Sequence, residues 1–319
     1  MSSTPTTIRI ATRGSALALW QAHWVRDRLQ ADDPALTVEL LVLKTRGDKI
    51  LDRALSEVGG KGLFVKEIEE ALLDGRAEVA VHSMKDLPAE IPEGLVLGAV
   101  PLREDPRDAL VVAPAHAARD VASLPRGARV GTSSLRRVCQ LKARRPDLEL
   151  VPLRGNVDTR VRKVDANELD AIVLACAGLK RLGHGARITA ALSTEESLPA
   201  IGQGALAIQC RADDPETRAR LGKLDDRTTA LAVTAERALL KRLAGDCKTP
   251  LGAHATVDGA RLTIEGLVGA PDGSRLIRHA LQGAADDAEA VGRALAEELL
   301  ARGADALLTF TTAEIVGGE

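Results

Sequence analysis

The stretch IRIATRGSALALWQAHWVRDRL, residues 8–29, decides the fold at the amino-terminal end of the chain. Its first residues alternate as in a strand, and the apolar residues that follow recur at helical spacing: Leu17, Trp20, Trp24, Val25 and Leu29. Working outward, VELLVLKT (38–45) predicts a second strand, and residues 63–73 predict an amphipathic helix that Gly75 ends as its C′ residue. AEVAVHS (77–83) predicts a third strand. This βαβα order predicts a largely parallel sheet.

The pattern restarts after the charged segment PLREDPRD (101–108). Four further apolar runs predict a second α/β domain: ALVVA (109–113), ARVGT (128–132), LELVPL (148–153) and DAIVLACA (170–177). The strand-like run in LPAIGQGALAIQCR (198–211) suggests that the chain then crosses back to the first domain. From about Asp225 a helix, strands joined by turns and a final helix predict a small α+β domain. We therefore expect three domains: residues 1–103 with 203–224, residues 104–202, and residues 225–319.

The composition is that of a globular protein, with 319 residues, 45% hydrophobic and 28% charged, and it excludes disordered and fibrous classes. A formal charge of −2 and only four aromatic side chains, two Trp and two Phe, argue against general nucleic-acid or anionic-membrane binding. Arginine outnumbers lysine by 32 to 11, which favours bidentate recognition of carboxylates or phosphates. No secretory leader or membrane-spanning run is found, so we expect a cytoplasmic protein.

Two glycine motifs point only weakly to nucleotide binding. GQGALA (202–207), followed by Asp225, matches G-x-G-x-x-A, but it follows Pro199 rather than a strand and precedes an apolar run rather than a helix. GGKG (59–62) lacks the spacing of a phosphate-binding loop and is more typical of a mobile glycine loop. We therefore predict no dinucleotide site.

Arginines follow successive predicted strands, where ligands bind in open α/β sheets and helix amino termini add positive potential. They are Arg13, Arg136, Arg137, Arg154, Arg160 and Arg181. Each alone could be a solvated surface residue. Their recurrence after one strand after another instead predicts a pocket for a polyanion.

Ser83, Lys85 and Asp86 lie just past a predicted strand, in AVHSMKDLP (80–88). Asp86 could steer a cationic group or move a proton, or it could pair with Lys85 and cap a turn. Cys247 lies in a predicted loop, where a thiol could be a nucleophile, a covalent attachment point or an unremarkable side chain. The chain has three other cysteines, all in or beside apolar runs and predicted to be buried, inert thiols: Cys139, Cys176 and Cys210. No two cysteines are spaced as a metal or redox pair.

Eleven motifs in the same order carry a family resemblance: IATRGSALALWQA, TRGD, GGKGLFVKE, AVHSMKDLP, REDPRDA, GTSSLRR, RRPDL, LRGNVDTR, AGLKRLG, LPAIGQGALAIQCR and TAERALLKRLAGDCKTPLG. Together they resemble the porphobilinogen deaminases, or hydroxymethylbilane synthases, from about residue 8 to residue 256, with weaker similarity beyond. The resemblance implies two hinged α/β domains like those of periplasmic binding proteins and a small α+β domain. It also implies head-to-tail condensation of four porphobilinogen units into hydroxymethylbilane, with release of ammonia, in haem biosynthesis.

The resemblance further implies a dipyrromethane cofactor held by a thioether to Cys247. Asp86 would be the catalytic carboxylate, stabilising the azafulvenium-like cation left by loss of ammonia and moving protons. The cofactor would be held by Ser83, Lys85, Ser134, Arg136 and Arg137. The substrate carboxylates would be bound by Arg13, Ser15, Arg154, Arg160 and Arg181, with Lys61 and Phe64 on a flap over the site. No metal is implied.

One departure from the family pattern is Asp246, where a small residue is expected; its charge could raise the pKa of Cys247, or it could face solvent. We expect an active, monomeric enzyme whose only partner is porphobilinogen. A rival interpretation is a non-enzymatic anion receptor with an arginine-lined cleft, which a pigment on Cys247 would exclude. A nucleic-acid-binding role for the arginines is disfavoured by the acidic balance.

Overall fold

The computed structural model describes residues 7–45, 65–243 and 249–308. The chain divides into two compact units. Unit 1 consists of Met1–Arg103 and Ala205–Ala230, and unit 2 consists of Glu104–Gly204 and Leu231–Glu319. The expected separation of residues 225–319 as a third domain stays a prediction.

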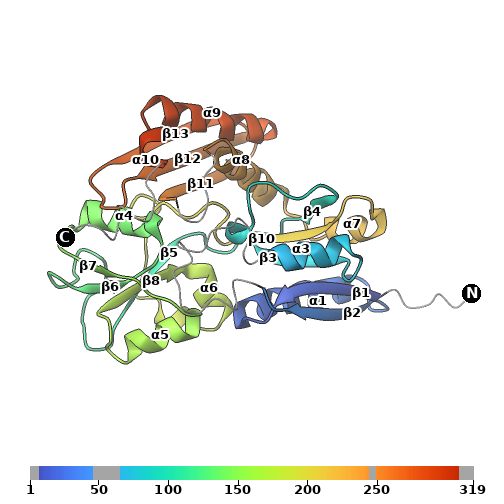
Figure 1. Ribbon diagram of the computed structural model, residues 1–319, viewed down its shortest axis with the longest axis horizontal. Coiled ribbons are helices and arrows are strands. Elements are labelled where there is room, and N and C mark those ends of the chain that lie inside the picture. Colours follow the sequence, from blue (N-terminus) through green and yellow to red (C-terminus); the bar gives the residue numbers. More distant parts are fainter. Residues whose placement is uncertain (1–6, 46–64, 244–248, 309–319) are drawn as a thin grey trace, which may run out of the picture. The chain divides into compact units, whose positions relative to one another are not determined.

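Unit 1 is built on a five-stranded sheet of order β2-β1-β3-β10-β4 (Figure 1). Its strands are β1 (Thr7–Arg13), β2 (Thr37–Leu43), β3 (Val79–Ser83), β4 (Leu95–Ala99) and β10 (Leu206–Arg211). As predicted, β1 pairs in parallel with β2 and β3. Strand β10 lies antiparallel between β3 and β4, so the chain does return to the first sheet.

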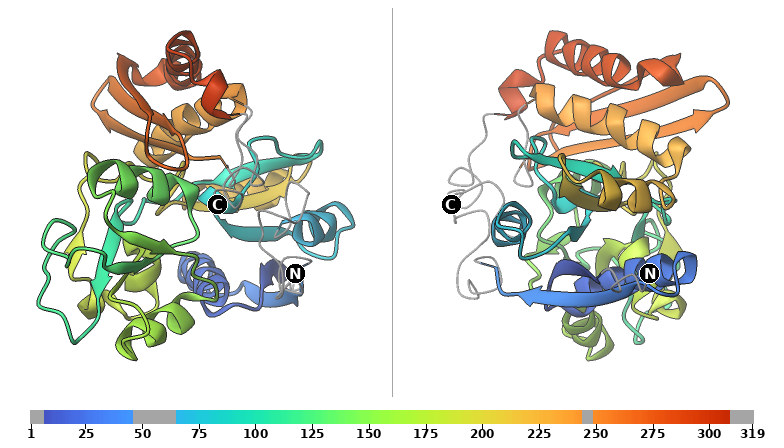
Figure 2. Two further views of the ribbon diagram at one scale, coloured as in Figure 1. Left: turned by 60° about the vertical axis from the view of Figure 1, so that its left-hand side comes forward. Right: turned by 90° about the vertical axis from the view of Figure 1, so that its right-hand side faces the viewer.

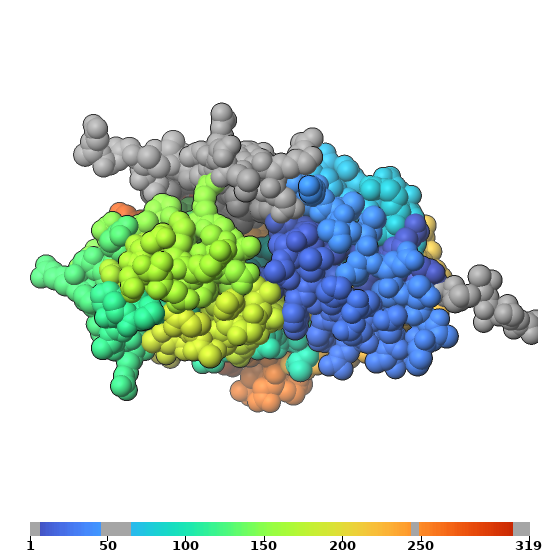
Figure 3. Space-filling view, turned by 90° about the horizontal axis from the view of Figure 1, so that it is seen from below, coloured from blue at the N-terminus to red at the C-terminus, as the bar shows by residue number. Residues whose placement is uncertain are grey.

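Helices cover both faces of this sheet, so its inner strands β3 and β10 are buried on both sides. Helices α1 (Ala16–Asp32) and α7 (Pro215–Gly222) share one apolar core with Val79 and Val81 of β3. Helix α3 (Lys66–Leu73) packs on the opposite face with Ala80. Gly75 ends the α3 turn with a φ of +70°, as its predicted C′ role requires. In the space-filling view, α1 and β2 form a continuous blue outer surface of unit 1 (Figure 3).

Unit 2 contains a second five-stranded sheet of order β7-β6-β8-β5-β9. Its strands are β5 (Asp108–Val112), β6 (Arg129–Gly131), β7 (Glu149–Val151), β8 (Ala171–Ala175) and β9 (Ala190–Ala191). The fourth strand, β5, is antiparallel to its neighbours, as β10 is in the first sheet. Helices α5 (Val157–Asp165) and α6 (Cys176–Arg181) pack on one face and α4 (Leu135–Arg144) on the other.

The carboxy-terminal part of unit 2 is an antiparallel sheet of three strands, shown in orange in Figure 2. The strands are β11 (Leu251–Asp258), β12 (Arg261–Gly269) and β13 (Leu276–Ala284), and the helices are α8 (Arg227–Leu243), α9 (Ala288–Ala301) and α10 (Asp305–Leu308). Leu239 of α8 and Leu295 of α9 pack over Gly266 of β12. On the other face of the sheet, Leu267 packs with Cys139 of α4. The predicted fold class, two α/β sheets plus a small α+β part, is confirmed.

Candidate active site

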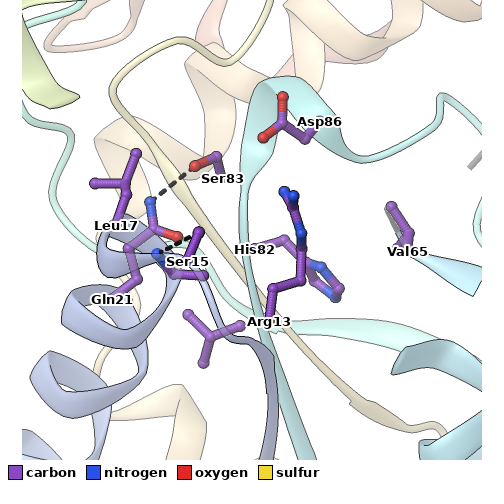
Figure 4. Close-up of a pocket in the computed structure, with 10 residues that line it drawn as sticks. Arg13, Ser15, Leu17, Gln21, Val65, His82, Ser83 and Asp86 are labelled. Carbon is purple, nitrogen blue, oxygen red and sulfur yellow. Dashed lines mark hydrogen bonds between the residues drawn. The ribbon is translucent and has the colours of Figure 1, made fainter. Parts of the chain in front are cut away.

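A pocket of about 50 Å³ lies in unit 1 at the carboxyl ends of β1 and β3 (Figure 4). The two strands are parallel and in register, so they end at the same edge of the sheet. Arg13 is the last residue of β1, and Ser83 is the last residue of β3. The pocket is lined by Arg13, Ser15, Leu17, Ala18, Gln21, Val65, Val81, His82, Ser83 and Asp86. Four residues predicted for the site are therefore brought together here.

Helix α1 begins at the pocket. Ser15 is its N-cap, and the Ser15 hydroxyl accepts a hydrogen bond from the Ala18 amide at 3.3 Å. One turn further on, the buried Gln21 donates from Nε2 to the Ser83 hydroxyl at 2.8 Å, which ties the helix to the end of β3. The positive end of the helix dipole therefore faces a site that also holds Arg13, a setting that favours a carboxylate ligand.

Asp86 is exposed in a short turn that Met84 and Leu87 anchor in the core. It ends a single 3-10 turn, Met84–Asp86, that follows β3. Met84 and Leu87 are 1% and 3% exposed, and the Met84 amide donates to the Ala205 carbonyl at 3.0 Å. Figure 4 shows the Arg13 guanidinium extending toward Asp86. A carboxylate and a guanidinium in one pocket can bind a cationic group and an anionic group of the same ligand. Lys85, between Met84 and Asp86, is also exposed.

In unit 2, Arg136 and Arg137 are 3% and 6% exposed rather than solvated. Both pair with the fully buried Asp108, each with a shortest nitrogen–oxygen distance of 2.7 Å. Ser197 and Gln203 also donate to Asp108, at 2.7 and 2.9 Å. Burial alone would raise the pKa of Asp108, but the charges of the two arginines outweigh it and hold that pKa far below its usual range.

Two guanidiniums on one carboxylate leave this cluster with a net positive charge. The buried Nε of Arg136 has no hydrogen-bond partner in the described structure. Nearby, burial and the like charge of Arg137 lower the pKa of Arg160 to about 10. Burial likewise lowers the pKa of Arg181 to about 10, so both remain cationic at neutral pH. An orphaned donor and surplus buried cations fit a ligand that carries several carboxylates.

Two of the remaining arginines lie on helices, Arg160 on α5 and Arg181 at the end of α6, and both contact backbone carbonyls. Arg160 donates from Nε to the Gly155 carbonyl at 2.8 Å, and Arg181 donates from Nη2 to the Gly204 carbonyl at 2.8 Å. Arg154 is exposed in the connection between β7 and α5, and Ser134 is the half-buried N-cap of α4. Lys61, Phe64, Asp246 and Cys247 lie outside the described residues.

The other cysteines are buried, as predicted, and burial raises the pKa of each thiol. The pKa values are about 12 for Cys139 and about 11 for both Cys176 and Cys210. Within the described ranges, no cluster of three or more His, Cys, Asp or Glu could hold a metal ion. A search of the same ranges finds no helix with the length and apolar character to cross a membrane.

Three residues of these sites were not singled out from the sequence: Gln21, His82 and Asp108. A histidine at the end of the apolar run AEVAVHS was a usable signal for His82. Asp108 ends the charged segment PLREDPRD, where nothing local distinguishes it from the half-buried Asp105 and the exposed Arg107. Its partners lie 28 to 95 residues away in the sequence.

Two family models match the chain. One, described as "Porphobilinogen deaminase, dipyromethane cofactor binding domain", matches residues 8–219, and the other, "Porphobilinogen deaminase, C-terminal domain", matches residues 230–301. A porphobilinogen deaminase from Syntrophotalea carbinolica is 57% identical over 301 residues, which cover 94% of this chain and 95% of that protein.

Two solved periplasmic proteins also resemble parts of the chain. The BvgS VFT2 domain of Bordetella pertussis is 19% identical with a TM-score of 0.41, covering 68% of this chain and 86% of that one. The aliphatic sulphonate binding protein SsuA of Escherichia coli is 15% identical with a TM-score of 0.41, covering 75% and 70%.

Proposed function

This chain belongs to the porphobilinogen deaminase family, and from that premise we propose that Asp86 is the catalytic carboxylate of its reaction. The enzyme condenses four porphobilinogen molecules head-to-tail into hydroxymethylbilane in tetrapyrrole biosynthesis. Each condensation breaks a carbon–nitrogen bond as ammonia leaves, forms a carbon–carbon bond and removes a proton from a pyrrole carbon. The reacting carbon becomes electron-poor on the way, so a carboxylate beside it lowers the barrier.

The observation that carries the proposal is the pocket at the ends of β1 and β3. It presents one anion, Asp86, and one cation, Arg13, beside the amino terminus of α1. Porphobilinogen carries a cationic aminomethyl group together with an acetate and a propionate. Arg13 and Ser15 would bind a ring carboxylate. The Asp86 carboxylate would face the aminomethyl ammonium, stabilise the cation that is left when ammonia departs, and accept the pyrrole proton afterwards.

The matching amino-terminal family model is that of a domain that binds a dipyrromethane cofactor. When bound, this group supplies a free pyrrole α-carbon as the nucleophile. We propose that it is attached through Cys247 and that Ser83, Lys85, Ser134, Arg136 and Arg137 bind it. The surplus positive charge around Asp108 and the unpartnered Nε of Arg136 support this for the arginines. Arg154, Arg160 and Arg181, with Lys61 and Phe64, would bind the carboxylates of the growing chain.

The proposal is tested with Asp86→Asn, which removes the charge and keeps the size of the side chain. We expect a loss of at least about a hundredfold in kcat, typical of a missing catalytic proton carrier, with the cofactor still attached. Glu90→Gln is the matched control, because Glu90 is an exposed carboxylate four residues further on. A kcat for Asp86→Asn close to that of the control would show that Asp86 has another role.

The attachment is tested by the intact mass of the purified protein and of Cys247→Ser. We expect an excess mass of two linked pyrrole units in the first and none in the second. The same excess in both would place the attachment on another residue. An unmodified mass that persists after incubation with porphobilinogen would instead favour an anion receptor. We further propose a cytoplasmic monomer without nucleic-acid or membrane partners, which gel filtration at the mass of one chain would support.

A further inference from the structure

Three polar side chains are buried between α3 and the sheet of unit 1. They are Glu69 on α3, His82 on β3 and Gln209 on β10, and they are 8%, 6% and 0% exposed. In the antiparallel pairing of β3 with β10, His82 lies opposite Ala207 and Gln209 lies opposite Ala80. His82 and Gln209 are therefore diagonal neighbours on one face of the sheet, the face that α3 covers. Buried polar groups in such a layer need hydrogen-bond partners from the protein or from water.

The contact with Glu69 sets the direction of the Gln209 amide. Gln209 donates from Nε2 to Oε1 of Glu69 at 3.0 Å. Because a side-chain amide has its donor and its acceptor on opposite sides, the Gln209 carbonyl is directed away from Glu69. That carbonyl oxygen has no hydrogen-bond partner in the described structure, and neither does Nε2 of His82, which is also buried. The Gln209 side chain raises the pKa of His82, as a carbonyl directed at the imidazole does.

His82 also lines the pocket that holds Arg13 and Asp86. Burial lowers the pKa of His82 to about 4, the Gln209 side chain opposes the shift, and the positive charge of Arg13 adds to it. Burial raises the pKa of Glu69, which the bond from Gln209 opposes. The charged groups around the imidazole are thus Arg13 from β1, Asp86 beyond β3 and Glu69 from α3, and at neutral pH the ring carries a single proton.

We propose that Glu69 and Gln209 hold His82 as an uncharged ring protonated at Nε2, and that His82 is thereby a positioning residue for the pocket. It keeps the end of β3 in place without adding a positive charge beside Asp86. This rests on the proposed role of Asp86, because an imidazolium in the same pocket would compete with the cationic reacting group for that carboxylate. Nothing in this arrangement requires His82 to touch substrate.

The tautomer is tested directly by two-bond nitrogen–proton NMR correlation on the holoenzyme labelled at its six histidines. His82 is assigned by the signal that disappears in His82→Gln. We expect the neutral form protonated at Nε2, unchanged between pH 7.5 and 5.5. A proton on Nδ1, or a titration midpoint above pH 6, would overturn the proposal. The NMR result does not depend on the role of Asp86. A failure of this proposal can therefore be told apart from a failure of the proposed function, which would appear as activity retained in Asp86→Asn.

The functional role is tested with Gln209→Glu, which replaces the amide beside the imidazole with a carboxyl group. The introduced carboxyl group lies next to that of Glu69, so one of the two ionises, and its negative charge raises the pKa of His82. His82 should therefore titrate between pH 5 and 7 in the same spectra. If the His82 pKa rises to the ordinary histidine value of about 6.5, only about a tenth of the variant carries a neutral ring at pH 5.5. We therefore expect kcat at pH 5.5, relative to pH 7.5, to be about tenfold lower than in the unaltered enzyme.

The matched control is His23→Gln, because His23 also has a buried ring nitrogen without a partner in the described structure but lies on α1 outside the pocket lining. We expect its pH profile of kcat to be that of the unaltered enzyme. If His82 in Gln209→Glu still does not titrate, the Gln209 carbonyl does not face it. If His82 titrates and the pH profile stays unchanged, its charge does not matter to the pocket. Either result overturns the proposal.

Discussion

Asp108→Asn should destabilise unit 2 strongly, because it removes the only carboxylate that pairs with Arg136 and Arg137 in the described structure. Asp108 is 0% exposed, and its oxygens accept from both guanidiniums, from Ser197 and from Gln203. The asparagine keeps the size of the side chain but leaves two buried guanidiniums without a counter-charge. One of its two acceptor sites also becomes a donor that faces other donors.

The magnitude follows from the burial of the cluster. Removing one partner from a buried ion pair costs about 3–5 kcal/mol of unfolding free energy, a large share of the about 5–15 kcal/mol that stabilises a typical domain. The loss has a pH dependence of known sign. The pKa of Asp108 in the folded protein lies below its unfolded value, so its stabilisation is complete above about pH 4 and declines as the pH falls toward the folded value. Asp108→Asn lacks this contribution at every pH.

Urea unfolding followed by circular dichroism at pH 7 and at pH 3 measures both effects. Asp147→Asn is the matched control, since Asp147 pairs with Arg145 at the same 2.7 Å but both side chains are partly exposed to water. We expect a much smaller change for the control, because water screens exposed pairs. Equal losses in the two variants, or a midpoint for Asp108→Asn within error of the unaltered protein, would refute the argument.

Two further predictions concern packing. A Cβ at Gly204, where φ is +90°, would lie 2.3 Å from the Glu104 carbonyl oxygen, so Gly204→Ala should lower the unfolding free energy by at least about 2 kcal/mol and depress Tm. Gly222→Ala is the control, because a Cβ there would have no described atom within 4 Å, and an equal loss would contradict the clash. The other prediction concerns the buried thiols of Cys139, Cys176 and Cys210, whose pKa values are raised by burial. In Cys247→Ser at pH 8, a thiol reagent should label none of them until denaturant is added, and labelling of the native protein would contradict this.

Local signals predicted the elements and the edge of the sheet where the pocket lies. Ser15 before an apolar helical run and Gly75 after one mark helix ends through contacts within a few residues, so they can be recognised from sequence. The strand before Asp86 is apolar through most of its length, which places Asp86 at the ligand-binding end.

Long-range pairing could not be predicted in the same way. Arg136 and Arg137 are adjacent in α4, a pattern typical of an exposed face. Their burial is explained by partners far away in the sequence, above all the carboxylate of Asp108 on β5. Gln209 lies in an apolar run whose other residues give no sign of a polar partner, because Glu69 is 140 residues away. Pairings over such distances depend on topology, which periodicity does not contain.

The position of β10 in the first sheet also bears on how the protein is made. Strand β10 is central, between β3 and β4, yet residues 206–211 are synthesised more than a hundred residues after β4. A ribosome that has completed the first two hundred residues therefore holds a sheet with a missing inner strand and two unpaired edges, which are liable to pair with other chains. Unit 1 can close only after most of the second sheet has been translated, so a fragment ending before residue 206 would not reproduce it.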